Sequence, residues 1–303
     1  MITIEETLAA GDIETALTVA PFLIYSEILE GARRPLVFLE VFKEDFSLVD
    51  AIGDILRYLR MKNYATAYEQ SESTVISGMS AETWTSSDFE EAHVEVTKVF
   101  WAAREVSDYL KENYPQFDFI RLAFRDMGKS VMEALDSKCK DTLVAASGIE
   151  TVNMGSDNIT YADVVDAIAA LKNVNWIPDP ANPPTLIIAP DMGAALLKDT
   201  LFITTERYTT AELANLVNGE IGRYAGCRVM ETSLLDGTGY AFVIYPSDTE
   251  LGPVCVMAWK RRLKVQTFYQ PKYPYTYLNT NCRAMPVVVQ PKGIVRLYTT
   301  ASP

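Results

Sequence analysis

The longest periodic segment of the chain is Phe117–Ala146. At about 100° per residue, its apolar side chains fall on one face of a helix and its charged side chains on the opposite face. The apolar face carries Ile120, Phe124, Met127, Val131, Ala134 and Leu135. The charged face carries Arg121, Arg125, Asp126, Lys129, Glu133, Asp136 and Lys140, and its spacing predicts the ion pairs Asp126–Lys129 and Asp136–Lys140. We therefore expect a long amphipathic helix that packs by its apolar stripe.

Two residues depart from this helical pattern. Lys138 interrupts the apolar stripe, and Leu122 lies on the polar side. Ion pairs on the solvent-exposed face contribute only about 0.2–0.5 kcal/mol each to helix stability, so they do not decide how the helix packs. The two misplaced residues indicate a second contact surface, at the end of the helix or on a neighbouring subunit.

The N-terminal part of the chain is less regular. Residues 1–48 mix short helical fragments with glycine and proline breaks and end in a β-like run at Leu36–Phe42, so we expect an extended arm. Ser47 is a candidate N-cap, and apolar residues follow it at helical spacing as far as Met61. This pattern predicts a short docking helix, which we assign to 49–61.

The segment Lys62–Lys98 is the least core-like part of the chain. Alternating residues at Tyr64–Tyr68 and His93–Val99 predict two strands of a long hairpin with a polar tip. Between its end lysines it has acids and no base, namely Glu69, Glu72, Glu82, Asp88, Glu90, Glu91 and Glu95. Charge of one sign on a hairpin too thin to form a core requires a partner surface or water. A subunit contact and a solvated acidic loop both stay open as interpretations.

The rest of the chain alternates helices and strands. Other predicted segments are a helix at Phe100–Tyr114, a loop at Ser147–Asn158, a helix at Tyr161–Lys172 with a capping box at Thr160 and Asp163, a strand at Thr185–Ala189, a helix opened by Pro190 and a helix from Thr210. Strands are predicted at Cys227–Thr232, Tyr240–Tyr245, Leu263–Tyr269, Asn279–Gln290 and Gly293–Thr299. This order indicates an α+β fold rather than a repeated βαβ series.

Few residues are candidates for catalysis or for binding a metal or cofactor. His93 is the only histidine, and its surroundings are typical of a strand or hairpin base rather than a nucleophile motif. The cysteines lie far apart without metal-ligand spacing, so we expect buried free thiols at Cys139, Cys227, Cys255 and Cys282. No phosphate-binding loop occurs, and no catalytic, cofactor-binding or metal site is predicted. An enzyme that uses carboxylates alone stays an alternative in a chain with 40 acidic residues.

Charge narrows the set of partners. The net charge is −13, from 27 Lys and Arg against 40 Asp and Glu, which disfavours a sequence-independent grip on nucleic acid or an anionic membrane. The chain starts with acidic residues, and its most apolar run, Ala16–Tyr25, is about half the roughly 20 residues of a membrane span. We therefore expect a protein that is cytosolic when made and has no membrane partner. The one strong basic cluster, read either as a solvated strand edge or as an ion-pair contact, is Lys260, Arg261, Arg262 and Lys264.

The order of these segments resembles that of the major capsid proteins of tailed viruses, which have the Hong Kong 97 fold. The resemblance is carried by the arm, the acidic hairpin, the run from FEEAHVEVTK through the long helix, TYADVVDAIAALK, LIIAPDMGAALLKD, GEIGRYAGCRVMETSLL and the closing segment that starts at KRRLKVQTFYQ. No single motif is specific, but their order is. The resemblance implies an N-arm at 1–48, an E-loop at 62–97, a peripheral domain at 98–146 and 258–303 with the long helix as its spine, and an axial domain at 147–257.

The resemblance also implies a function. Such subunits assemble as pentamers and hexamers into an icosahedral shell that encloses double-stranded DNA without sequence-specific binding, in a virion assembled in the host cytoplasm. Portal, scaffolding or decoration proteins would be further partners. An acidic inner wall suits this task, because it lets DNA be packed and released. Some family members crosslink an E-loop lysine to a neighbour, but no lysine lies between Lys62 and Lys98, so no such crosslink is expected.

Opposite charges suggest where subunits meet. We hypothesise that the acidic hairpin docks near the basic cluster of a neighbour, with Glu69, Glu72, Glu82, Glu90 and Glu91 facing Lys260, Arg261, Arg262 and Lys264. Two other readings stay open. An encapsulin-like cellular nanocompartment would keep the fold and hold protein cargo in an internal groove, which the sequence does not locate. An unrelated cytosolic enzyme would rely on carboxylate chemistry.

Overall fold

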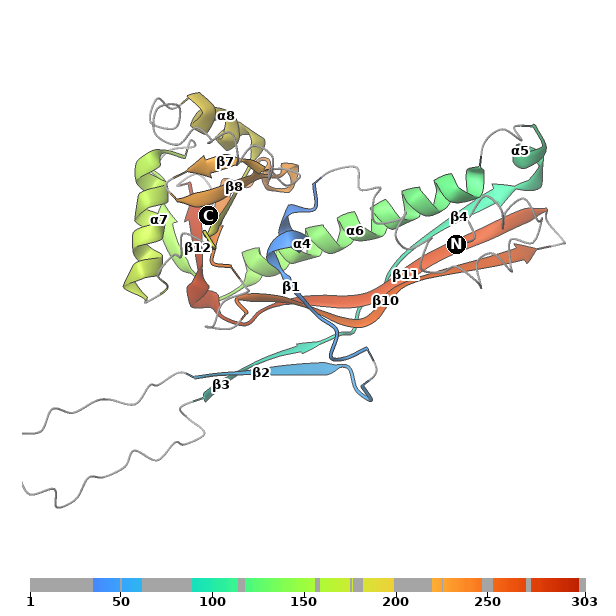
Figure 1. The fold of residues 1–303 in the computed structure, drawn as a ribbon, viewed down its shortest axis with the longest axis horizontal. Helices are drawn as coiled ribbons and strands as arrows, with labels where there is room; N and C mark the ends of the chain where they lie inside the picture. Colours follow the sequence, from blue (N-terminus) through green and yellow to red (C-terminus); the bar gives the residue numbers. More distant parts are fainter. Residues whose placement is uncertain are drawn as a thin grey trace, which may run out of the picture.

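Three sheets and one long helix organise the part of the protein that the structure describes. The computed structural model describes residues 35–49, 51–61, 89–113, 118–155, 159–174, 176, 182–198, 220–224, 226–246, 253–270 and 274–299. Figure 1 shows an elongated subunit, in which the long helix runs beside a long sheet and ends at a second sheet covered by helices. This mixed α+β architecture confirms the predicted fold class.

Helix α6 (Phe119–Ala145) is the long helix predicted from the sequence. It is capped by Asp118, whose side chain accepts a hydrogen bond from the backbone N–H of Arg121 at 3.0 Å. Its buried apolar side chains recur every three or four residues and are Ile120, Phe124, Met127, Val131, Leu135, Cys139 and Leu143. The apolar stripe is therefore confirmed, with the exception of Ala134, which is exposed.

The charged face of α6 differs from the prediction in two places. Asp136 is fully buried, because its Oδ1 accepts the backbone N–H of Leu39 at 3.0 Å, so its placement on the solvent face was wrong. Asp126 forms an ion pair with Arg104, on a neighbouring strand, at 2.6 Å. Both contacts join α6 to segments far away in the sequence, which helical spacing alone does not predict.

The four-stranded sheet has the order β1 (Lys43–Asp45), β10 (Cys255–Gln270), β11 (Tyr275–Val288) and β4 (Phe100–Ser107). The strands predicted at Leu263–Tyr269 and Asn279–Gln290 are confirmed as parts of β10 and β11, which form a long antiparallel hairpin. The N-terminal half of α6 packs on this sheet, where Phe124 and Met127 join Val106 and Leu278 in one apolar cluster.

The helix predicted at Phe100–Tyr114 is wrong for its first half. Residues of β4 pair with β11 from Phe100 to Ser107, and only α5 (Asp108–Asn113) is helical. Pairing with a neighbouring strand outweighs the helical pattern of this segment.

The six-stranded sheet has the order β5 (Glu150–Asn153), β12 (Ile294–Tyr298), β9 (Tyr240–Ile244), β6 (Thr185–Ile188), β8 (Cys227–Glu231) and β7 (Glu220–Tyr224). The predicted strands at β6, β8, β9 and β12 are confirmed. The loop predicted at Ser147–Asn158 contains β5, which pairs with β12. Because β12 lies in this sheet, the C-terminal segment 258–303 is divided between the two larger sheets.

Helices α7 (Tyr161–Asn173) and α8 (Pro190–Lys198) accompany the six-stranded sheet and confirm two sequence predictions. Thr160 and Asp163 form the predicted capping box, and Pro190 is the first residue of α8. Among the described connections are the 3₁₀ turns Ser233–Leu235 and Pro291–Gly293. The main core lies between this sheet, these helices and the C-terminal half of α6.

The N-terminal segments differ most from the prediction. The β-like run at Leu36–Phe42 contains a short helix, α4 (Val37–Val41), because Val37 and Phe38 are fully buried in the main core. The docking helix expected at 49–61 is wrong, since β2 (Ile55–Met61) pairs antiparallel with β3 (Phe89–Glu95). Exposure alternates along β2 from Ile55 to Arg60, which is the period of a strand.

Some predictions lie outside the described residues. These are residues 1–34 of the predicted arm, the strand at Tyr64–Tyr68, the helix from Thr210 and the acidic side chains Glu69, Glu72, Glu82 and Asp88. Of the predicted hairpin, the described part is the antiparallel pairing of β2, which precedes Lys62, with β3, which contains Glu90, Glu91 and Glu95.

Replacing Thr160 with Ala should lower the free energy of unfolding by about 1 kcal/mol, because α7 loses the side chain that accepts the backbone N–H of Asp163. Thr160→Ser keeps the hydroxyl and serves as the control. Urea unfolding of dissociated subunits measures both variants. Equal losses for Ala and Ser would contradict the capping role.

Candidate functional site

The acidic hairpin is tied to the long sheet by a basic side chain of the predicted contact cluster. Lys260 donates from Nζ to the backbone oxygens of Ala51 and Gly53 at 2.6 and 2.7 Å, and lies 3.7 Å from the carboxylate of Asp54. These residues form the turn that enters β2. Lys260 is therefore engaged at the hairpin base of its own subunit.

A second basic residue, on β11, completes this anchor. Arg283 Nη2 donates to Asp54 Oδ2 at 3.2 Å and to the backbone oxygen of Val96 at 2.9 Å. Asp54 precedes β2 and Val96 follows β3, so one guanidinium joins the start of β2 and the end of β3 to the four-stranded sheet. Near the other end of β2, Arg60 donates from Nη1 to the backbone oxygen of Val289 at 3.0 Å. Beneath these contacts lies a small apolar cluster of Leu48, Val94, Val96 and Ala258.

A carboxylate–phenol pair joins β1 to β2. Tyr58 donates its hydroxyl hydrogen to Asp45 Oδ2 at 2.6 Å, and the backbone N–H of Ser47 donates to Asp45 Oδ1 at 2.9 Å. Burial alone would raise the pKa of Asp45, but the hydrogen bonds from Ser47 and Tyr58 outweigh it and lower that pKa. Burial and the adjacent Asp45 carboxylate raise the pKa of Tyr58. Asp45 is thus held as a carboxylate and Tyr58 as its donor.

The other predicted contact residues fall into two groups. Glu90 and Glu91 pair with Arg60 and Arg57 inside the hairpin, at 2.6 and 3.3 Å. Exposed on β10, where register shifts interrupt its pairing with β11, are Arg261, Arg262 and Lys264. A bulge of this kind redirects side chains away from the regular face of a sheet. The structure therefore separates the anchoring residue Lys260 from the three exposed bases.

Arg262 has contacts on its own subunit, with the ring of Phe46 and, through its charge, with the carboxylate of Glu44. Its guanidinium lies 4.3 Å from the ring centroid of Phe46, which itself stacks with Trp259 at 6.1 Å. This cation–π contact orients the side chain while leaving it exposed.

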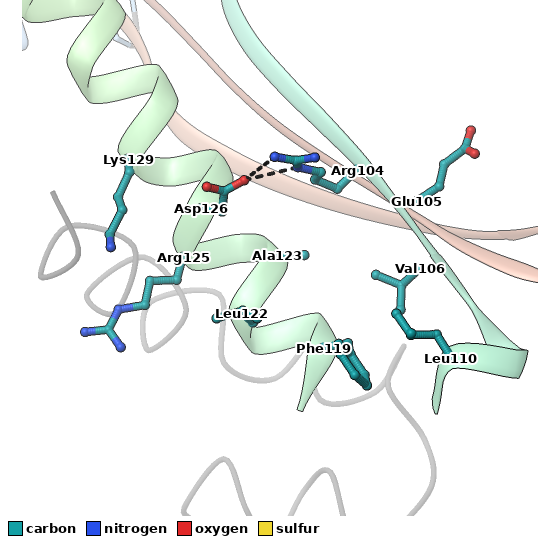
Figure 2. Close-up of a pocket in the computed structure, with 10 residues that line it drawn as sticks. All are labelled: Arg104, Glu105, Val106, Leu110, Phe119, Leu122, Ala123, Arg125, Asp126 and Lys129. Atoms are coloured by element: carbon teal, nitrogen blue, oxygen red, sulfur yellow. Dashed lines mark hydrogen bonds and ion pairs between the residues drawn. The ribbon is translucent and has the colours of Figure 1, made fainter. Parts of the chain in front are cut away.

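A groove of about 410 Å³ lies between β4, α5 and the first turns of α6 (Figure 2). Arg104 and Asp126 bridge it, with Arg104 Nη2 and Nε at 2.6 and 3.1 Å from Asp126 Oδ2. Figure 2 shows Arg125 and Lys129 directed away from β4, on the other side of the helix from this pair. Leu122 lines the groove and is 61% exposed, which confirms its predicted place on the polar face.

The second misplaced residue of the helix, Lys138, lines another groove. This groove, of about 550 Å³, lies between the hairpin, β11 and the last turns of α6, and His93 of β3 lines it as well. The prediction that His93 belongs to a strand is confirmed.

Catalytic chemistry has little support among these side chains. All four cysteines are buried free thiols, as predicted, and burial raises the pKa of Cys139, Cys255 and Cys282, the last to about 12. Such thiols stay protonated and are poor nucleophiles. Within the described residues, no three His, Cys, Asp or Glu side chains gather as metal ligands, and no helix has the length and apolar character of a membrane span. The surfaces are suited to contacts by charge and apolar area.

A family model identifies the family of this chain. A family model described as phage capsid protein matches residues 105–297, from β4 to β12. The chain belongs to this family. It is a major capsid protein, a structural component of the virion shell, and the predicted resemblance to tailed-virus capsid proteins is confirmed.

Solved structures show that the capsid protein has the Hong Kong 97 fold. It is similar to the capsid of the cyanophage P-SCSP1u, with a TM-score of 0.64 and 16% identity over 88% of this chain and 89% of that one. It also resembles a virus-like particle of Pyrococcus furiosus, with a TM-score of 0.57 and 14% identity over 92% and 99% of the two chains. The SrpI encapsulin of Synechococcus elongatus gives a TM-score of 0.61 and 10% identity over 87% of each chain. A comparison with curated proteins found no match.

Sequence reasoning missed several residues of the hairpin base. Asp45, Asp54, Tyr58 and Arg283 come from β1, from the turn and strand of β2, and from β11, and no spacing rule connects these three segments. The stretch ILRYLRM does not alternate apolar and polar residues, so no period-2 signal marked it as a strand.

Replacing Asp45 with Asn should destabilise the capsid protein more at neutral than at acid pH. The pKa of Asp45 is lower in the folded protein than in the unfolded chain, so its carboxylate stabilises the fold above the unfolded value of about 4. This contribution is lost as the pH falls through the folded-state pKa. The difference in unfolding free energy between wild type and Asp45→Asn should therefore shrink from about pH 7 to about pH 3.

Urea titrations of dissociated subunits at the two pH values measure this difference. The control is Asp166→Asn, at an exposed position of α7. A difference for Asp45→Asn that does not change with pH would show that the carboxylate is not what holds β1 to β2.

Proposed function

We propose that this major capsid protein assembles as pentamers and hexamers into an icosahedral shell that encloses double-stranded DNA, within a virion built in the host cytoplasm. The match to the phage capsid family over 105–297 is the observation that carries the proposal. The elongated subunit supports it, because a long helix that runs beside one sheet and ends at a second sheet offers several edges to neighbours (Figure 1). The protein would act without catalysis, and portal, scaffolding or decoration proteins would be further partners.

The domain division follows the same proposal. The N-arm would comprise 1–48 and the E-loop 62–97, entered through β2 and left through β3. The peripheral domain would be the four-stranded sheet with α6, and the axial domain the six-stranded sheet with α7 and α8. Because β12 pairs with β9 and β5, we assign it to the axial domain rather than to the peripheral segment 258–303.

A charged contact would join neighbouring subunits. Acidic residues Glu69, Glu72 and Glu82 of one E-loop would face the exposed bases of the next subunit, which are Arg261, Arg262 and Lys264. Glu90, Glu91 and Lys260 support this contact indirectly, since they pair within the hairpin and its base and thereby hold the E-loop in place. Opposite charge on the two surfaces would guide the subunits into register.

DNA would be enclosed rather than gripped. The net charge of −13 repels phosphate, so packaging requires no specific site on the shell wall. An encapsulin-like compartment is the second candidate function, because the fold similarity extends to an encapsulin.

Particles purified from expressing cells test the proposal by negative-stain microscopy and nuclease treatment. In the viral background we expect closed shells of uniform size that protect double-stranded DNA. Closed shells that hold protein and no nuclease-resistant DNA would favour the encapsulin-like function. Monomers alone would contradict both shell functions.

The double variant Arg261→Glu, Arg262→Glu should assemble less well than wild type, with a larger defect at low salt than at high salt. Exposed ion pairs contribute only about 0.2–1 kcal/mol each, but every contact in the shell repeats them. The electrostatic range falls from about 30 Å at 0.01 M salt to about 8 Å at 0.15 M. Light scattering during assembly over this salt range measures the effect.

The matched control is Lys172→Glu, Lys292→Glu, which changes the net charge equally at exposed positions on α7 and beside β12. If it impairs assembly as much as the variant of the basic cluster, net charge rather than a local contact is responsible, and the proposed contact is wrong.

A further inference from the structure

An arginine from the six-stranded sheet closes the C-terminal end of α6. Arg296, on β12, donates from Nη2 to the backbone oxygens of Leu143 and Val144 at 3.0 and 2.7 Å. The last turn of α6 has no basic residue of its own. Because the final carbonyls of a helix lack intrahelical donors and carry partial negative charge, a cation from outside stabilises them.

The position of Arg296 is itself fixed by its neighbours on the sheet. Its guanidinium lies 5.7 Å from the ring centroid of Tyr240 and 5.8 Å from that of Phe242, both on β9. These rings provide cation–π contacts, and the hydrogen bonds to α6 are partly buried. The end of the helix is therefore attached to one defined place on β12 and β9.

Helix α4 makes a second attachment between α6 and the six-stranded sheet. On one side, the backbone N–H of Leu39 donates to the buried Asp136 of α6 at 3.0 Å. On the other side, Glu40 pairs with Arg228 of β8. Phe38, fully buried between these contacts, packs α4 into the main core.

The two attachments lie on different strands of the six-stranded sheet. In the strand order, β9 and β6 separate β12, which holds Arg296, from β8, which holds Arg228. The main core already packs the sheet against the C-terminal half of α6, but apolar contacts are not directional. Two polar attachments that are separated across the sheet add directional contacts at two points and so restrict its orientation further.

We propose that Arg296 and the α4 bridge set the angle between the six-stranded sheet and α6, and through it the curvature of the assembled shell. Arg296 is a positioning residue in this role. The inference rests on the proposed shell function, since an angle that is repeated in every subunit determines how a closed particle curves. A small change in one subunit is thereby expressed as a change in particle diameter.

Arg296→Gln and Glu40→Gln test the proposal, each removing one attachment. Arg296→Lys keeps the positive charge but not the planar guanidinium, so it should rescue only part of the effect. The control is Ile187→Val, a buried change in the central strand β6 that lowers stability without touching either attachment. Thermal unfolding of dissociated subunits gives the stability of each variant, and electron microscopy gives the distribution of particle diameters.

We expect Arg296→Gln and Glu40→Gln to shift or widen the distribution of particle diameters. Ile187→Val should leave the wild-type distribution unchanged, even if its melting temperature is as low as that of the two attachment variants. Unchanged diameters in both attachment variants, with stability alone reduced, would overturn the inference while leaving the shell function intact. If Arg296→Gln does not fold, Glu40→Gln decides by the same criterion. Failure of wild-type protein to form shells would instead refute the proposed function.

Discussion

The structure depends on how one long apolar stripe is buried. A helix of 27 residues spans about 40 Å, which is longer than one small core can cover. The N-terminal half of α6 is therefore buried by the four-stranded sheet, around Val106 and Leu278, and the C-terminal half by the core of the six-stranded sheet. Dividing the burial in this way makes the subunit elongated and gives each sheet its own edges.

Polar contacts then fix the parts that the apolar stripe leaves free. Lys260 and Arg283 attach the hairpin to the long sheet, while Arg296 and Asp136 attach the second sheet and α4 to the helix. Each of these four side chains bonds to backbone atoms of a distant segment. Backbone groups cannot rotate away as exposed side chains do, so such contacts define orientation better than pairs of surface charges.

Sequence patterns predicted elements whose burial is local. The stripe of α6, the capping box at Thr160 and the apolar strand that begins at Thr185 follow from spacing within one segment, and the fold class and family followed from their order. Patterns failed where a distant partner decides the conformation. The segment from Phe100 is a strand because β11 pairs with it, and the burial of Asp136 requires the N–H of Leu39. The hairpin base could not be predicted, because its four side chains come from three segments that are distant from one another in the sequence.

We propose that this capsid protein is a repeating unit whose acidic E-loop completes its contacts on a neighbouring subunit. Electron cryomicroscopy of assembled particles tests that claim most directly. We predict density for the stretch that contains Glu69, Glu72 and Glu82 of one subunit against Arg261, Arg262 and Lys264 of the next. Density that places this stretch against the basic strand of its own subunit, with no contact to a neighbour, would contradict the account.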